Sequence, residues 1–158
     1  DTEYFINKIN VIRIIRPDIN ITTDVIVGFP GETSEDFENT IDTIKKCGFT
    51  KLHVFPYSKR EGTPAAKMKN QIDGNEKKKR VRRLLDLSKC LEIDYMNKYL
   101  DTTVSFIPEV YKDGYLTGHT DNYLLIKCAG EKGNLKKDIM VHTESISYPY
   151  LMSTKVND

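Results

Sequence analysis

The stretch that most constrains this chain is ITTDVIVGFPGET, residues 21–33, where an apolar run leads directly into a turn rich in glycine and proline. Val25, Ile26 and Val27 are continuously apolar, which is typical of a strand buried on both faces in a parallel sheet. Thr33 follows the turn as a candidate cap for an acidic helix. Because ligands of α/β folds bind where strands end and helices begin, this turn is a candidate binding site.

The first part of the chain alternates predicted helices and strands. Helices are expected over residues 2–16 and from Thr33 to a stop at Gly48, and a long helix over residues 76–100. KLHVFPYS, residues 51–58, predicts a second strand. This order predicts an α/β fold built on a parallel sheet or barrel. Two strands cannot close a barrel, so we expect this part to belong to a larger protein.

The remainder of the chain has a different pattern. Five short apolar runs, separated by turns such as KDG, predict strands at residues 104–107, 115–117, 123–128, 139–143 and 146–150. Strands this short, with no helix signal between them, are typical of a small β-barrel of the OB type. We therefore predict an α/β part followed by an all-β part, with the boundary near Leu100.

Composition excludes several classes of protein. The chain is 39% apolar and 30% charged, and it has no apolar run near 18 residues, so no membrane helix is expected. The first residues do not form a signal peptide. The three cysteines are scattered without a CxxC pair, which favours reduced thiols in a cytoplasmic protein and no metal site. The three histidines are equally scattered.

Positive charge is concentrated in the middle of the chain. Residues 59–98 hold 12 Lys and Arg against 6 Asp and Glu, whereas the segments on either side are mildly acidic. This distribution favours contact with a polyanion in one region only. A solvated helix face is the alternative explanation for the basic run at residues 77–83.

The residues of the VGFPGET turn are compatible with three interpretations. Gly28 and Gly31 supply unusual backbone angles and nothing more in the first. A phosphate cradle is the second, although the absence of GK[ST] disfavours a nucleoside triphosphatase. In the third, the backbone approaches a nucleoside closely, with Ile26 as an apolar face and Glu32 as a polar edge.

Longer motifs narrow this choice. DVIVGFPGET, followed by LHVFPYSKREGTPAAKM, resembles the fifth and sixth barrel strands of the radical S-adenosylmethionine methylthiotransferases, which modify tRNA or a ribosomal protein. The tail is similar to their TRAM module, a small RNA-binding β-barrel. The resemblance implies the C-terminal part of a radical barrel at residues 1–98 and a TRAM domain at residues 99–158. LHVFPYS and GHTDNYLLIK are most similar to the bacterial branch that acts on N6-threonylcarbamoyladenosine next to the tRNA anticodon.

The resemblance also implies the chemistry. Members of this family hold S-adenosylmethionine and two 4Fe–4S clusters, take electrons from a reducing donor, and methylthiolate C2 of the adenine through a 5′-deoxyadenosyl radical. This chain has neither the CxxxCxxC loop nor the domain that holds the auxiliary cluster. We therefore expect a C-terminal fragment that ligates no cluster, carries no catalytic residue and is inactive alone.

By the same resemblance, the two strands and the first turn contribute to the cofactor site. The implied cofactor-binding residues are Asp24, Ile26, Gly28, Glu32, Val54 and Phe55. Gly28 would permit close approach, and Ile26 would pack near the adenine. Asp24 replaces the first glycine of the superfamily pattern GxIxGxxE, and Glu32 falls one residue late in it. Burial in the core is the alternative role for Ile26 and Phe55.

The expected partner is a tRNA anticodon stem-loop. Lys59 and Arg60 leave the second strand at its carboxyl end and are candidates for phosphate contact. The basic candidates on the long helix are Lys77, Lys78, Lys79, Arg80, Arg82 and Arg83. The candidates for base contact in the small barrel are Tyr115, His119, Asn122 and Tyr123.

Two other functions stay open from the sequence. One is a sister methylthiotransferase that acts on isopentenyladenosine in tRNA or on a ribosomal protein. The other is an RNA-binding module without catalysis.

Overall fold

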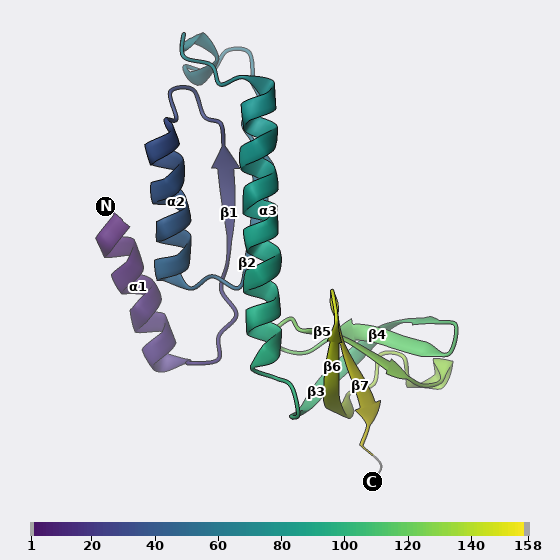
Figure 1. The fold of residues 1–158 in the computed structure, drawn as a ribbon. Helices are drawn as coiled ribbons and strands as arrows, with labels where there is room; N and C mark the ends of the chain where they lie inside the picture. Colours follow the sequence, from purple (N-terminus) through teal and green to yellow (C-terminus); the bar gives the residue numbers. More distant parts are fainter. Residues whose placement is uncertain (1, 157–158) are drawn as a thin grey trace. The chain divides into compact units, whose positions relative to one another are not determined.

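The computed structural model describes residues 2–156, which form two compact units that divide between Glu92 and Ile93 (Figure 1). None of the described helices combines the length and the apolar character needed to cross a membrane. The order of elements confirms the predicted α/β part followed by an all-β part.

The first unit is built from helices around a two-stranded parallel sheet. Its elements are α1 (Thr2–Ile15), β1 (Thr22–Val27), α2 (Ser34–Cys47), β2 (Lys51–Pro56), the short 3-10 helix η1 (Ala65–Lys67) and most of α3 (Gly74–Asn97). In the sheet Val25 lies opposite Val54, and Ile26 lies opposite Phe55. This parallel register brings the carboxyl ends of β1 and β2 side by side.

Local signals fix the ends of α2 as predicted. The Thr33 hydroxyl accepts a hydrogen bond from the Asp36 amide at 3.1 Å, and the Asp36 carboxylate accepts from the Thr33 amide at 2.9 Å, which completes a capping box. Gly48 ends the helix in the left-handed conformation at φ 61°. Between the caps, Phe37 and Ile41 lie on the buried face.

The core of the first unit lies on one face of the sheet only. Val25 and Val27 pack with Phe37, Leu52 and other apolar side chains of the helices. Ile26 points the other way and is 59% exposed. The prediction that β1 is buried on both faces is therefore wrong for the described chain, because no described element of this unit covers the second face.

The second unit is a closed barrel of five strands. They are β3 (Thr103–Lys112), β4 (Tyr115–His119), β5 (Leu125–Ala129), β6 (Ile139–Ser147) and β7 (Tyr150–Lys155), with the 3-10 helix η2 (Lys132–Asn134) before β6. The order around the barrel is β3-β4-β5-β7-β6, and pairing of β3 with β6 closes it. All pairs are antiparallel except β5 with β7. This confirms the predicted small β-barrel.

Several boundaries differ from the sequence prediction. The strand predicted at residues 104–107 extends over residues 103–112, and the long helix spans residues 74–97 rather than 76–100. The strand predicted at residues 146–150 is wrong, because β6 continues to Ser147 and β7 begins only at Tyr150. The turn between them contains Pro149, which has no N–H to donate to a sheet ladder. At the other end of the unit, Tyr95 and Met96 of α3 pack into the barrel core, so this unit begins within the helix.

We predict that the two units differ in local stability. The barrel has no free sheet edge, whereas the first unit exposes large apolar side chains on α1 and on the open sheet face, Ile14 at 79% among them. Amide hydrogen exchange of the whole chain is expected to be faster in β1 and β2 than in β4 and β7. Equal protection of the two units would contradict this prediction.

Candidate functional site

The turn after β1 is held by residues from α3. Gly28 is buried at φ 72°, and a Cβ atom built on it would lie 2.2 Å from the Cγ atom of Lys77. The Lys77 side chain therefore occupies the space that a side chain at position 28 would need. Glycine is favoured at position 28 because its backbone has a positive φ and because Lys77 of α3 packs against it where a side chain would lie.

Glu32 points back into this turn. Its Oε2 atom accepts a hydrogen bond from the Gly28 amide at 2.8 Å and also from the Arg80 guanidinium. Arg80 donates in addition to the Glu32 carbonyl oxygen at 3.0 Å. Since this oxygen is engaged within the turn, the described geometry gives Glu32 an internal role.

Arg80 itself is buried, which fits neither the predicted phosphate contact nor the alternative of a solvated helix face. Only 5% of the residue is exposed, and its Nε atom donates to Glu76 at 3.0 Å. Burial lowers the pKa of Arg80, but hydrogen bonds to Glu32 and Glu76 outweigh that effect and raise the pKa above its usual value. The guanidinium also lies over the ring of Phe37, 5.4 Å from its centre.

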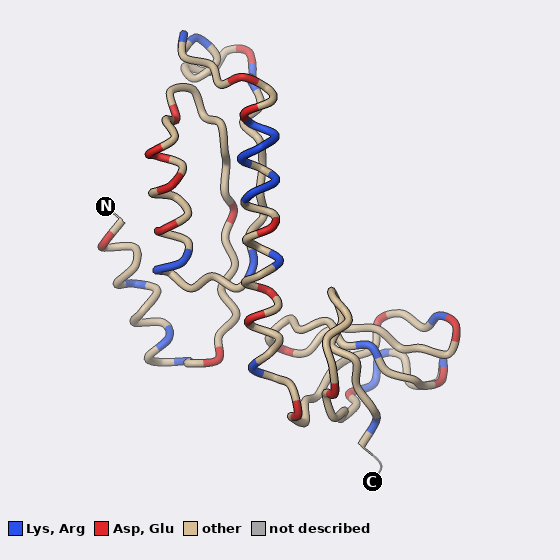
Figure 2. The backbone as a smooth tube through the Cα atoms, in the orientation of Figure 1, with Lys and Arg blue, Asp and Glu red and all other residues tan. Residues whose placement is uncertain are grey.

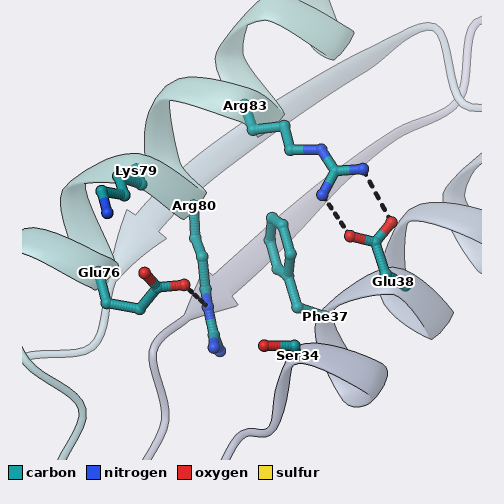
Figure 3. Close-up of a pocket in the computed structure, with 7 residues that line it drawn as sticks. All are labelled: Ser34, Phe37, Glu38, Glu76, Lys79, Arg80 and Arg83. Carbon is teal, nitrogen blue, oxygen red and sulfur yellow. Dashed lines mark hydrogen bonds and ion pairs between the residues drawn. The ribbon is translucent and has the colours of Figure 1, made fainter.

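A shallow pocket between α2 and α3 surrounds this arginine (Figure 3). Its lining residues are Ser34, Phe37, Glu38, Glu76, Lys79, Arg80 and Arg83. Arg83 forms a bidentate pair with Glu38, drawn in Figure 3 as the dashed lines that join these two side chains. Because Arg80 and Arg83 have carboxylate partners, the pocket does not offer an unpaired guanidinium to an anion.

The open face of the sheet gathers three of the sequence-predicted cofactor residues. Ile26 and Phe55 are register partners, 59% and 51% exposed, and Asp24 lies beside them opposite His53. Val54 is half-buried and packs against the core on the other face. The structure thus brings Asp24, Ile26 and Phe55 together and turns Val54 away from them.

The basic candidates divide into two groups. Figure 2 shows Lys and Arg concentrated along the first turns of α3. Lys77 points inward, where its Nζ atom donates to the Tyr57 carbonyl at 3.3 Å, and Arg82 pairs with Asp86. Four other candidates are exposed on the first unit, either on α3 or just after β2. They are Lys59, Arg60, Lys78 and Lys79.

The barrel carries an aromatic cluster that the sequence analysis found only in part. Tyr115 of β4 is 42% exposed, and the Nζ atom of Lys127 on β5 lies 4.7 Å from its ring centre. The same Nζ atom lies 5.4 Å from the ring centre of Tyr150 on β7. The sequence analysis missed Lys127 and Tyr150 because only the barrel closure places β7 beside β5. Alternation of buried and exposed residues along β5 was the available signal for Lys127.

The other barrel candidates lie near the loop between β4 and β5. His119 is hydrogen-bonded to Glu109 at 3.0 Å, and its ring centre lies 5.6 Å from that of Tyr123, which is 77% exposed. Asn122 instead serves the fold, because its amide donates to the hydroxyls of Tyr95 and Tyr99.

The described residues do not fit an iron–sulfur cluster. No group of three His, Cys, Asp or Glu side chains within residues 2–156 is arranged to hold a metal ion. Cys47 and Cys128 are buried singly, and burial raises the pKa of both thiols, which disfavours the thiolate that a cluster needs.

Comparison with known proteins gives close relatives. Over 153 residues, 94% of this chain, it is 41% identical to the threonylcarbamoyladenosine tRNA methylthiotransferase MtaB of Bacillus subtilis (strain 168). It is also 40% identical over 139 residues to the tRNA-2-methylthio-N(6)-dimethylallyladenosine synthase of Aquifex aeolicus (strain VF5), with 88% of the chain aligned. The chain is homologous to the C-terminal region of the tRNA methylthiotransferases. This confirms the predicted resemblance, although no family model matches the chain.

The matched region is a part of each relative. The chain spans about a third of their length, 34% of the Bacillus subtilis protein and 32% of the Aquifex aeolicus one. The synthase of Desulfitobacterium hafniense (strain Y51) is 38% identical over 82% of the chain, which spans 30% of it. The identities of 41%, 40% and 38% are too similar to decide which of the two substrates in the relatives' names this chain would match.

Protonation of Asp36 is expected to weaken the start of α2. Hydrogen bonds from the Thr33 amide and hydroxyl hold the pKa of Asp36 below its usual value. Since the folded pKa is lower than the unfolded one, the cap contributes fully above the unfolded pKa and is lost as pH falls through the folded one. An NMR titration should show the Thr33 amide responding below the ordinary range of Asp. The Asp36→Asn variant should lack this response, and a midpoint at the ordinary pKa would contradict the prediction.

Proposed function

We propose that this chain is part of a tRNA methylthiotransferase that modifies C2 of N6-threonylcarbamoyladenosine next to the anticodon. The supporting observation is the 41% identity with the Bacillus subtilis enzyme over 94% of the chain, which extends through both units. In this proposal residues 1–98 are the end of a radical S-adenosylmethionine barrel, and residues 99–158 are a TRAM domain. Such an enzyme works in the cytoplasm with a reducing electron donor.

The second candidate substrate is N6-dimethylallyladenosine, because the synthases named for it are nearly as similar to this chain. The two substrates differ chemically at one substituent: threonylcarbamoyl carries a carboxylate, whereas dimethylallyl is apolar. Lys59 and Arg60 are exposed and follow β2 at its carboxyl end. A cation pair in that place favours the anionic substituent.

The open sheet face fits the adenine of S-adenosylmethionine. Ile26 and Phe55 form an exposed apolar pair, with the Asp24 carboxylate beside it as an acceptor for a ribose hydroxyl. When bound to a cluster, S-adenosylmethionine supplies the 5′-deoxyadenosyl radical. The role of these residues is to bind and orient the nucleoside and to exclude water from it. The cysteines of the described chain do not fit a cluster.

The RNA surface of the proposal combines charge and stacking. Exposed lysines on α3 would contact phosphates, and the aromatic cluster of Tyr115, Lys127 and Tyr150 would stack an unpaired base. Tyr123 and His119 offer a second stacking position near the loop between β4 and β5.

Binding of the chain to an anticodon stem-loop tests this proposal. Loops carrying threonylcarbamoyladenosine, dimethylallyladenosine or unmodified adenosine would be titrated at several salt concentrations. Preference for the threonylcarbamoyl loop that is lost in Lys59→Ala/Arg60→Ala is the expected result. Preference for the dimethylallyl loop would favour the second candidate, and no binding at low salt would contradict an RNA role for this chain.

Variants separate the charge and stacking contributions. Lys78→Ala/Lys79→Ala is expected to reduce the slope of log affinity against log salt by about 2, because two phosphate contacts are lost. Tyr115→Ala is expected to weaken binding about fivefold to a hundredfold at every salt concentration, which corresponds to one stacked base. Tyr4→Ala, an exposed tyrosine on α1, is the matched control and should change neither quantity. An unchanged affinity in Tyr115→Ala would exclude the aromatic cluster from the interface.

A further inference from the structure

The basic segment at the start of α3 contains two kinds of residue with different environments. Lys78 and Lys79 are exposed, whereas Lys77 and Arg80 point toward the strand ends. A buried guanidinium is costly unless hydrogen-bond acceptors replace its water, and Arg80 has acceptors from Glu32 and Glu76. The positions of Lys77 and Arg80 therefore need a different explanation from the phosphate contact proposed for Lys78 and Lys79.

Arg80 acts on the end of β1 through Glu32. The carboxylate oxygen that receives the guanidinium also accepts the Gly28 amide at 2.8 Å. Gly28 is the first residue after β1, and Ile26 lies two residues before it on the open face. Arg80, Glu32 and Gly28 thus form one continuous chain of hydrogen bonds from α3 to the strand.

Lys77 acts on the end of β2. Its methylene groups cover Gly28, and its Nζ atom donates to the carbonyl of Tyr57, two residues after Phe55. The Tyr57 amide in turn donates to the Val27 carbonyl at 2.8 Å, which continues the pairing of the strands past β2. One turn of α3 therefore holds the ends of both strands that carry the apolar pair.

We propose that Arg80 and Lys77 are positioning residues for the ligand of the open sheet face. Through Glu32 and Tyr57 they fix the carboxyl ends of β1 and β2, and thereby the separation and tilt of Ile26 and Phe55. This inference rests on the proposed function, in which that pair receives the purine nucleoside of S-adenosylmethionine. It also removes Arg80 and Lys77 from the set of phosphate contacts and leaves that role to Lys78 and Lys79.

The test is an NMR comparison of Arg80→Met, Glu32→Gln and the double variant with the parent chain. Loss of a charged hydrogen bond should speed exchange of the Gly28 amide by roughly tenfold to a hundredfold relative to amides of α2. Because the guanidinium and the Gly28 amide share one carboxylate oxygen of Glu32, the effects of the two substitutions on this amide should be less than additive in the double variant. The methyl signal of Ile26 and the ring signals of Phe55 should shift in each variant, and Arg80→Lys should restore them in part.

Lys79→Met is the matched control, since it removes a neighbouring charge from the same helix without touching the turn. It should leave the Gly28, Ile26 and Phe55 signals unchanged and lower RNA affinity, whereas Lys77→Met should move those signals and spare the salt dependence. If Arg80→Met lowers the urea midpoint but leaves these signals unchanged in the folded state, Arg80 is purely structural and the proposal is overturned. The readout needs no cofactor, so a failure of the proposed methylthiotransferase function would not alter its result.

Discussion

The arrangement of the first unit depends on a charged side chain, Arg80, that is buried in the folded chain. Arg80 belongs to the same helix turn as the exposed Lys78 and Lys79, yet its guanidinium is buried and hydrogen-bonded to both Glu32 and Glu76. Removing one partner of such a buried pair typically costs about 3–5 kcal/mol, so the position of the glutamate is strongly determined. The glutamate belongs to the turn after β1, and the turn fixes where the strand ends. A tertiary ion pair thus defines the geometry of a backbone segment that local propensity leaves open.

The two units solve the problem of exposed sheet surface in different ways. The barrel closes on itself, so every strand has neighbours on both sides and its core contains side chains such as Phe106 and Leu116. The two-stranded sheet of the first unit is covered by helices on one face only, so Ile26 and Phe55 on its other face are exposed to solvent. Large exposed apolar patches mark surfaces that meet a ligand or another protein surface. The exposed apolar pair that we expect to lower the stability of the first unit is also the surface that the proposed function assigns to the nucleoside.

Sequence reasoning succeeded where structure is determined locally. The caps of α2 depend on Thr33, Asp36 and Gly48, which act within a few residues of the chain. It failed where distant segments meet. The burial of Arg80 depends on a glutamate 48 positions away, and the aromatic cluster around Lys127 exists because β7 closes the barrel beside β5. The error at the last strand has a local cause, since Ser147 and Tyr150 were assigned to one run across a proline turn.

Whole-chain identity is a poor guide to the choice between the two adenosine substrates. Identity averages over about 150 positions, and those that build the core of the first unit, its helix caps and the contacts at the strand ends contribute to it alongside any that contact the substrate. The structural requirements are the same whichever substituent the adenine carries. A site that distinguishes a carboxylate from an apolar group needs few residues, because one charge-assisted contact and one unfavourable burial already separate them. Relatives with different substrates are therefore expected to be nearly equally similar to this chain. Under the proposed function, the side chains that follow β2 are expected to report the substrate better than the overall percentage does.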